Sequence, residues 1–96
     1  MTAIMVSNLT ITDPEEFQEY LRKSKELAGA YGAKLMFKGR FRERLNGDQD
    51  QKQMVVIAEF PNMDAIRSWN GSDAYQALVP LRDRSSVQNM MVYESD

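Results

Sequence analysis

The spacing of hydrophobic and polar residues changes several times along the chain, and each change predicts a new element. Residues 3–11 are short, apolar and rich in β-prone side chains, which predicts a strand. Asp13 is then placed to cap a helix, Pro14 suits its first position, and Glu16 completes a capping-box spacing. Apolar residues recur at steps of three and four until Gly32, which is placed to end this helix.

Strict alternation follows in residues 34–45 and predicts a second strand. One predicted face carries Leu35, Phe37, Gly39, Phe41, Glu43 and Leu45, and the other carries Lys34, Met36, Lys38, Arg40, Arg42 and Arg44. Asn46-Gly47 is typical of a tight hairpin turn, although the polar residues 48–52 leave a longer loop open. Residues 54–58 are apolar on both faces, which predicts a central strand.

The last third of the chain predicts an interrupted helix and a final strand. Asn62 can cap a first helical piece, Gly71 breaks it, and Ser72 can cap a second piece. Pro80 favours a further kink or break, and residues 87–94 form the last strand. The order β-α-β-β-α-β predicts an α+β, ferredoxin-like fold, in which a four-stranded antiparallel sheet has two helices on one face, the second of them broken.

Two helices can cover only one face of such a sheet, yet the strands are apolar on both faces. In the first strand, Met5 and Leu9 alternate with Ile4 and Val6. An exposed apolar face of this size favours association. We therefore expect a homodimer that packs sheet to sheet into a dimeric α+β barrel.

The amino-acid composition excludes several kinds of functional site. The 96 residues form a single domain, 1–96, and include no cysteine and no histidine. This excludes disulfides, zinc–thiolate sites and histidine-based catalysis, and the carboxylates are scattered singly, so we expect no metal and no cofactor. The net charge of -2 argues against a nucleic-acid partner. No targeting signal and no run of about 18 apolar residues is visible, so we expect a cytoplasmic protein without a membrane contact.

Several short motifs resemble a known family over nearly the whole chain. The motifs are Asp13-Pro14-Glu15 with Phe17 and Tyr20, Tyr31-Gly32-Ala33-Lys34, Lys38-Gly39, Glu59-Phe60-Pro61, Ser72-Asp73-Ala74-Tyr75-Gln76 after Trp69, and Leu81-Arg82. They resemble the family of domains of unknown function numbered 1330, in the dimeric α+β barrel superfamily. The resemblance implies a dimeric barrel, and related barrels include small monooxygenases and isomerases that need no cofactor. Lys38 stands where the family usually has arginine.

The charged residues of the two middle strands are the first candidates for chemistry. The basic row Lys34, Lys38, Arg40, Arg42 and Arg44 could bind an anion or line a pocket, or it could protect a solvated edge strand from aggregation. Glu43 and Glu59 lie toward the ends of neighbouring predicted strands and are the candidate catalytic carboxylates. The alternative is a structural ion pair or a capped turn.

Aromatic residues and one arginine are the second group of candidates. Tyr20, Tyr31, Trp69 and Tyr75 lie on predicted inward helix faces, where they could line a pocket or simply pack in the core. Arg82 could grip a carboxylate or pair with Asp83, Glu59 or the chain end. The candidate ligand-binding set is Tyr20, Lys38, Arg40, Trp69, Tyr75 and Arg82.

Two functional hypotheses follow. The first is a small-molecule site for an anionic or aromatic ligand, in a protein that could be a cofactor-independent enzyme. The second is a non-catalytic dimeric binding or accessory protein, suggested by the lack of histidine, cysteine and any nucleophile motif. A pocket that contains both Arg82 and a carboxylate would favour the first.

Overall fold

A computed structural model of the protein describes residues 2–48 and 52–96. Its elements are β1 (Ala3–Ile11), α1 (Pro14–Ala30), β2 (Lys34–Arg40), β3 (Met54–Phe60), α2 (Met63–Gly71), α3 (Asp73–Gln76), α4 (Val79–Ser85) and β4 (Ser86–Glu94). The strands form one antiparallel sheet in the order β2-β3-β1-β4. The predicted α+β, ferredoxin-like arrangement is therefore confirmed.

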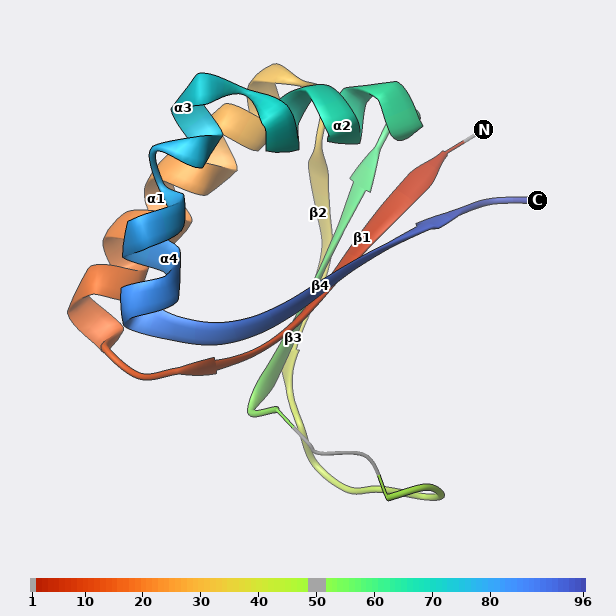
Figure 1. The fold of residues 1–96 in the computed structure, drawn as a ribbon. Coiled ribbons are helices and arrows are strands. Elements are labelled where there is room, and N and C mark those ends of the chain that lie inside the picture. Colours follow the sequence, from red (N-terminus) through yellow and green to blue (C-terminus); the bar gives the residue numbers. More distant parts are fainter. Residues whose placement is uncertain (1, 49–51) are drawn as a thin grey trace.

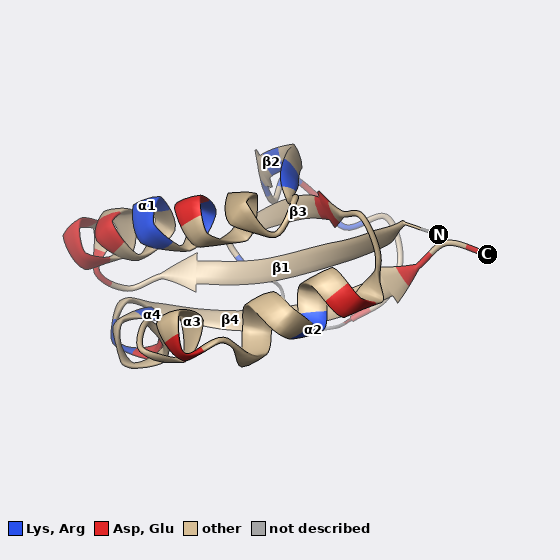
Figure 2. Cartoon of the chain, turned by 90° about the horizontal axis from the view of Figure 1, so that it is seen from above, with Lys and Arg blue, Asp and Glu red and all other residues tan. Residues whose placement is uncertain are grey.

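All the helices lie on one side of the sheet, and the opposite side has no helix over it (Figure 1). Seen from above, α1 forms one row and α2, α3 and α4 form a second row beside it (Figure 2). β1 lies at the centre of the sheet, where Met5 is paired with Ala58 of β3 and with Val92 of β4. Met5 thus lies at the middle of the sheet, under the line where the two helical rows meet.

The first helix begins and ends at the residues that its sequence indicates. Asp13 Oδ1 accepts a hydrogen bond of 3.1 Å from the backbone N–H of Glu16, and Pro14 opens the first turn. The helix ends just before Gly32, whose φ is +87°. A Cβ atom on Gly32 would lie 2.8 Å from the ring of Pro61, so this turn needs glycine both for its backbone angle and for its space.

The second helical row is interrupted, as expected. Asn62 Oδ1 accepts a 2.8 Å hydrogen bond from the N–H of Ala65, which starts α2. Ser72 Oγ accepts a 3.1 Å hydrogen bond from the N–H of Tyr75, which starts α3. Pro80 lies in the first turn of α4, where its missing N–H costs nothing. The three short pieces turn the row so that it follows the twisted sheet.

β2 differs from its predicted form in length and in register. It ends at Arg40, because its last sheet partner is Met54, the first residue of β3. Residues 41–48 leave the sheet, so Arg42 and Arg44 do not continue a basic strand face. A β-bulge between Leu35 and Phe37 also breaks the alternation. The prediction of one continuous basic row on residues 34–44 is therefore wrong. Gly47 in the predicted turn at Asn46-Gly47 has a positive φ of +94°. The alternative, a longer loop over residues 48–52, includes residues 49–51, which lie outside the described residues.

The hydrophobic core lies between the sheet and the helices. Its buried residues are Ala3, Leu9, Phe17, Tyr20, Phe60, Ile66, Trp69, Tyr75 and Leu78. The face of the sheet away from the helices is also largely apolar: Phe37 and Tyr93 are 55% and 56% exposed there. The predicted apolar character of both faces is confirmed.

Candidate functional site

A cavity of about 280 Å³ lies between α1 and the sheet. Its walls are mainly apolar and include Met5, Val56 and Ala58 of the sheet, Leu21 and Ala28 of α1, and Trp69 of α2. Among the described residues, the charged ones that line it are Lys25, Lys34 and Lys38, and none of the lining residues is a carboxylate. None of these three lysines has an ion pair with another residue in ranges 2–48 and 52–96. The cavity therefore combines apolar walls with uncompensated positive charge at its edge.

The bulge in β2 explains why lysine and leucine line the same cavity. Before it, Leu35 pairs with Ala58, and after it Lys38 pairs with Val56. Because Met36 is an extra residue in the register, Leu35 and Lys38 are three positions apart yet both line the cavity. Without the bulge they would lie on opposite faces, as the alternation predicts.

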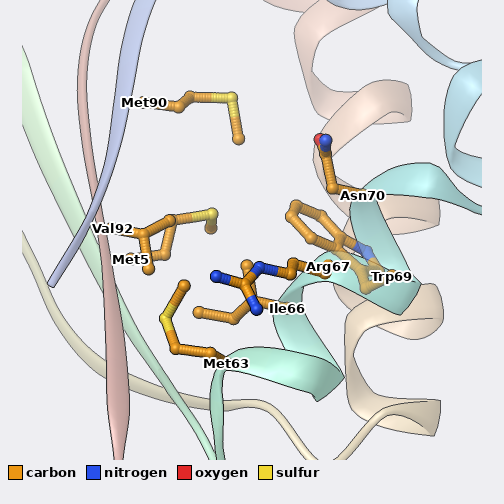
Figure 3. Close-up of a pocket in the computed structure, with 8 residues that line it drawn as sticks. All are labelled: Met5, Met63, Ile66, Arg67, Trp69, Asn70, Met90 and Val92. Carbon is orange, nitrogen blue, oxygen red and sulfur yellow. The ribbon is translucent and has the colours of Figure 1, made fainter. Parts of the chain in front are cut away.

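Trp69 separates this cavity from a second one. Its side chain is 1% exposed, and its ring packs on the rings of Phe60 and Tyr75 with centroid distances of 5.5 Å and 4.3 Å. The indole Nε1–H is buried and has no hydrogen-bond partner among the described residues. In Figure 3 the nitrogen lies at the end of the indole turned away from Met5 and Met90. A buried donor without a partner typically costs about 1–3 kcal/mol.

Tyr20, Tyr75 and Arg82 form a hydrogen-bonded cluster behind Trp69. The two tyrosine hydroxyls are 2.8 Å apart, and Arg82 Nη1 donates to the Tyr75 hydroxyl at 3.1 Å. Arg82 Nε also pairs with Asp83 at 3.0 Å, and the Nη1 group contacts the sulfur of Met90. Both tyrosine hydroxyls and the Nε and Nη1 groups of Arg82 therefore have partners, and the cluster holds Tyr75 against Trp69.

The cluster shifts the acidity of two of its members. Burial, followed by the neighbouring Tyr75, raises the pKa of Tyr20 well above its ordinary value near 10, while Ser24 and Arg82 act weakly in the opposite direction. Burial alone would lower the pKa of Arg82, but its hydrogen bonds to Tyr75 and Asp83 outweigh that effect and raise it. Tyr20 is thus neutral and Arg82 charged at neutral pH.

The structure divides the predicted site residues into three groups. Trp69 and Lys38 line the cavity, whereas Tyr20, Tyr75 and Arg82 lie behind its wall. Tyr31, at the end of α1, is partly buried and packs against the core. Arg40 is exposed at the end of β2 and lines neither this cavity nor the second one.

The two candidate carboxylates are far apart. Glu43 follows β2, beyond the pair Arg40–Met54, whereas Glu59 pairs with Lys34 at the other end of the hairpin. With a rise of about 3.4 Å per residue, they are at least about 17 Å apart along the strands. Neither lines either of the two cavities, and neither cavity contains Arg82. The proposed acid–base role of these two residues stays a prediction that this geometry does not support.

Sequence reasoning missed several residues that line the cavity. Lys25 lies four positions after Leu21 and three before Ala28, so the helical spacing already placed these three residues on one face of the helix. In the sequence, Met5, Val56 and Ala58 are apolar strand residues that look like ordinary core residues. Only their sheet register shows that they meet the same cavity.

No group of three or more histidine, cysteine, aspartate or glutamate residues that could hold a metal occurs in residues 2–48 and 52–96. Within the same ranges, no helix is long and apolar enough to cross a membrane. The cytoplasmic location stays a prediction.

The fold places the chain among ferredoxin-like α+β domains. The family model "Domain of unknown function (DUF1330)" matches residues 2–95, so the chain belongs to this family. No curated protein matches the chain.

Several solved structures have the same fold. A protein of unknown function from Rhodopseudomonas palustris is 22% identical, with a TM-score of 0.77, over 94% of this chain and 80% of that one. SnoaB, a cofactor-independent oxygenase from Streptomyces nogalater, is 16% identical, with a TM-score of 0.71, over 99% and 93%. A dimeric protein of unknown function with a ferredoxin-like fold from Bacteroides fragilis is 14% identical, with a TM-score of 0.56, over 98% and 96%.

Proposed function

We propose that the protein binds a small anionic molecule with an apolar or aromatic body in the cavity between α1 and the sheet. One observation carries the proposal: Lys25, Lys34 and Lys38 line the cavity without a carboxylate to balance them. A cavity that contains charge of only one sign favours ligands of the opposite sign. Its volume of about 280 Å³ lies at the lower end of the usual range for ligand sites, so it fits a molecule of about one ring with an acidic group.

Trp69 adds a second, directional feature. A ligand oxygen next to Nε1 would supply the hydrogen-bond acceptor that this buried donor lacks in the protein. The lysines would bind the anionic group from the edge, and the apolar walls would cover the body of the ligand.

The proposal can be tested with benzoate as a probe and benzyl alcohol as its uncharged counterpart. Trp69 is the only tryptophan, so a ¹H–¹⁵N spectrum contains a single indole resonance that reports on the cavity wall. We expect benzoate to move this resonance saturably, and benzyl alcohol to bind at least threefold more weakly. Rising salt should weaken benzoate binding, because the lysines are exposed. Equal binding of the two probes would contradict the proposal.

A matched pair of lysine variants tests the location. Lys38→Gln removes a cavity cation, whereas Lys23→Gln removes a cation from α1 that pairs with Glu19 and lines neither cavity. We expect Lys38→Gln to weaken benzoate about threefold, in line with about 0.7 kcal/mol for an exposed charge, and Lys23→Gln to leave it unchanged. Equal losses in both variants would show a general charge effect instead of a site.

Binding is favoured over acid–base catalysis as the function of this cavity. SnoaB is a cofactor-independent oxygenase, and the likeness to it concerns the fold. No carboxylate is among the described residues that line the two cavities, and the chain has no histidine or cysteine. The walls thus offer no side chain with an ordinary pKa near neutrality as a general base. Oxygen uptake by the protein with an aromatic ligand would favour the enzyme hypothesis over this one.

We also propose that the open face of the sheet pairs with a second copy of the chain. Val6 and Ile57 are paired across β1 and β3 on this face, and Phe37 and Tyr93 extend the apolar surface to both edges. Apolar faces of this extent are rare on monomers. The Bacteroides fragilis protein of the same fold is described as dimeric, which agrees with the proposal.

Sedimentation tests this pairing. The protein should sediment as a dimer at micromolar concentration, and Ile57→Lys should shift it toward the monomer of 11.0 kDa, because it would bury a charge in the interface. Ser68→Lys, on the exposed side of α2, is the control and should stay dimeric. A folded monomer in the unsubstituted protein would refute the pairing.

A further inference from the structure

A second cavity, of about 220 Å³, lies between α2 and the sheet on the other side of Trp69. Three methionine side chains, from β1, α2 and β4, line it together with Ile66 and Val92 (Figure 3). Among the residues that the structure describes, its polar lining residues are Arg67 and Asn70, apart from Trp69. Methionine side chains are flexible and polarisable, so they adapt their shape to an apolar group that enters between them.

The two cavities share a wall made of two residues. Met5 and Trp69 line both cavities, and no other residue in the described part of the chain does. Trp69 is held in place by its contacts with Phe60 and Tyr75. Met5 is unbranched and partly buried, and it stands between the helical rows at the middle of the sheet. It is therefore the part of the wall that can move.

The chemical character of the two cavities is different. The first carries three lysines at its edge, whereas the second is sulfur-lined and apolar with a single cation, Arg67, which is exposed and lies 3.8 Å from Asp64. Together they hold about 500 Å³, which is well within the usual range for ligand sites. A molecule that extended from one to the other would have its anionic end at the lysines and its apolar end between the methionines.

We propose that the two cavities are compartments of one site, that Met5 is the residue that separates them, and that the ligand is an elongated anion whose apolar body is longer than one ring. This inference rests on the proposed function, because it places the anionic group in the first cavity. Rotation of the Met5 side chain would open the passage. Met5 would thus determine how long a ligand the site accepts.

Two probes of different length test this inference. Benzoate fits the first cavity, and biphenyl-4-carboxylate carries a second ring that would pass Met5. We expect biphenyl-4-carboxylate to bind at least tenfold more tightly than benzoate, measured by the indole resonance of Trp69 and by calorimetry. If benzoate itself fails to bind, the proposed function is wrong. If benzoate binds and the second ring brings no gain, the proposed function stands and this inference is overturned.

Three variants locate the second ring. Val92→Phe fills the second cavity from β4, and Met5→Ile replaces the movable side chain with a β-branched one that suits a strand but is stiff at χ1. Both should remove most of the tenfold gain, and Val92→Phe, whose residue lines the second cavity and not the first, should leave benzoate affinity within twofold. Ala74→Phe adds a ring at an exposed position of α3 that lines neither cavity, and it should keep the gain. A gain that survives Val92→Phe would mean that the second ring points into solvent, which overturns the inference.

Discussion

Tyr75→Phe should destabilise the protein more than Tyr20→Phe, although each change removes one hydroxyl group. The Tyr75 hydroxyl is the centre of the cluster: it is hydrogen-bonded to the Tyr20 hydroxyl at 2.8 Å and accepts from Arg82 at 3.1 Å. Tyr20 is at its edge, with Tyr75 as its partner. Both side chains are almost fully buried, with 0% and 4% of Tyr75 and Tyr20 exposed.

The expected magnitudes follow from what each change leaves behind. Tyr20→Phe removes one neutral hydrogen bond and leaves Tyr75 bonded to Arg82, which costs about 1 kcal/mol. Tyr75→Phe leaves the buried Tyr20 hydroxyl without that partner, at about 1–3 kcal/mol. It also removes one partner of Arg82, which keeps Asp83 and some solvent contact, so this adds about 1 kcal/mol. We expect about 2–4 kcal/mol in total for Tyr75→Phe.

Thermal and chemical unfolding at fixed protein concentration measure the difference. At about 4–8 °C per kcal/mol for a chain of this size, Tyr20→Phe should lower Tm by roughly 5 °C and Tyr75→Phe by roughly 15 °C. The double variant should lose less than the sum, because it removes the unpaired Tyr20 hydroxyl. Equal losses in the two single variants, or strict additivity in the double variant, would refute the account of the cluster given above.

Three further predictions concern neighbouring features. Because the pKa of Tyr20 is raised in the folded protein, the contribution of Tyr20 to stability is complete below about pH 10 and is lost at more alkaline pH. Urea titrations at several pH values should show this loss of stability, and Tyr20→Phe should make the loss smaller. Gly32→Ala should lower the free energy of unfolding by more than about 1 kcal/mol, because Gly32 has a φ of +87° and lies against the ring of Pro61. Gly71 has open space around it, so Gly71→Ala should lower the free energy of unfolding by less in the same assay. Arg82→Ala should lower Tm yet change benzoate affinity less than twofold in the folded protein; a tenfold loss would instead place Arg82 at the ligand.

Most of the fold could be predicted from local sequence signals. Helix α1 has a cap at Asp13, proline at its first position and glycine after its end, and each of these acts within one turn of the chain. The breaks at Gly71 and Pro80 are local in the same way. Such features depend on the backbone preferences of single residues, so a sequence pattern is enough to locate them.

The end of β2 and its bulge depend on the partner strand and could not be predicted in this way. Arg40 is the last residue of β2 because β3 begins at Met54, and Gln53 is held by β1 through hydrogen bonds with Thr10 and Ile11. An alternating sequence continues past this point, but no strand lies opposite it. A strand pattern shows which residues can form a ladder, whereas the pairing decides which do.

The residues that line the candidate site also depend on contacts that a sequence pattern does not show. Four of the predicted residues do lie together, as their helical spacing indicated: Tyr20, Tyr75, Arg82 and Trp69. Of these four, only Trp69 lines either of the two cavities. Tyr75 packs behind Trp69 and is hydrogen-bonded to the hydroxyl of Tyr20 and to the guanidinium of Arg82. The cations that do line the cavity come from the opposite side, and Lys38 does so after a one-residue shift in β2. Polar groups that satisfy one another inside the core cannot also serve a ligand, since each hydrogen bond they make is already part of the folded state. The side chains to examine for binding are therefore those whose charge or donor the fold leaves unpaired; among the described residues that line the first cavity, these are the three lysines and Trp69.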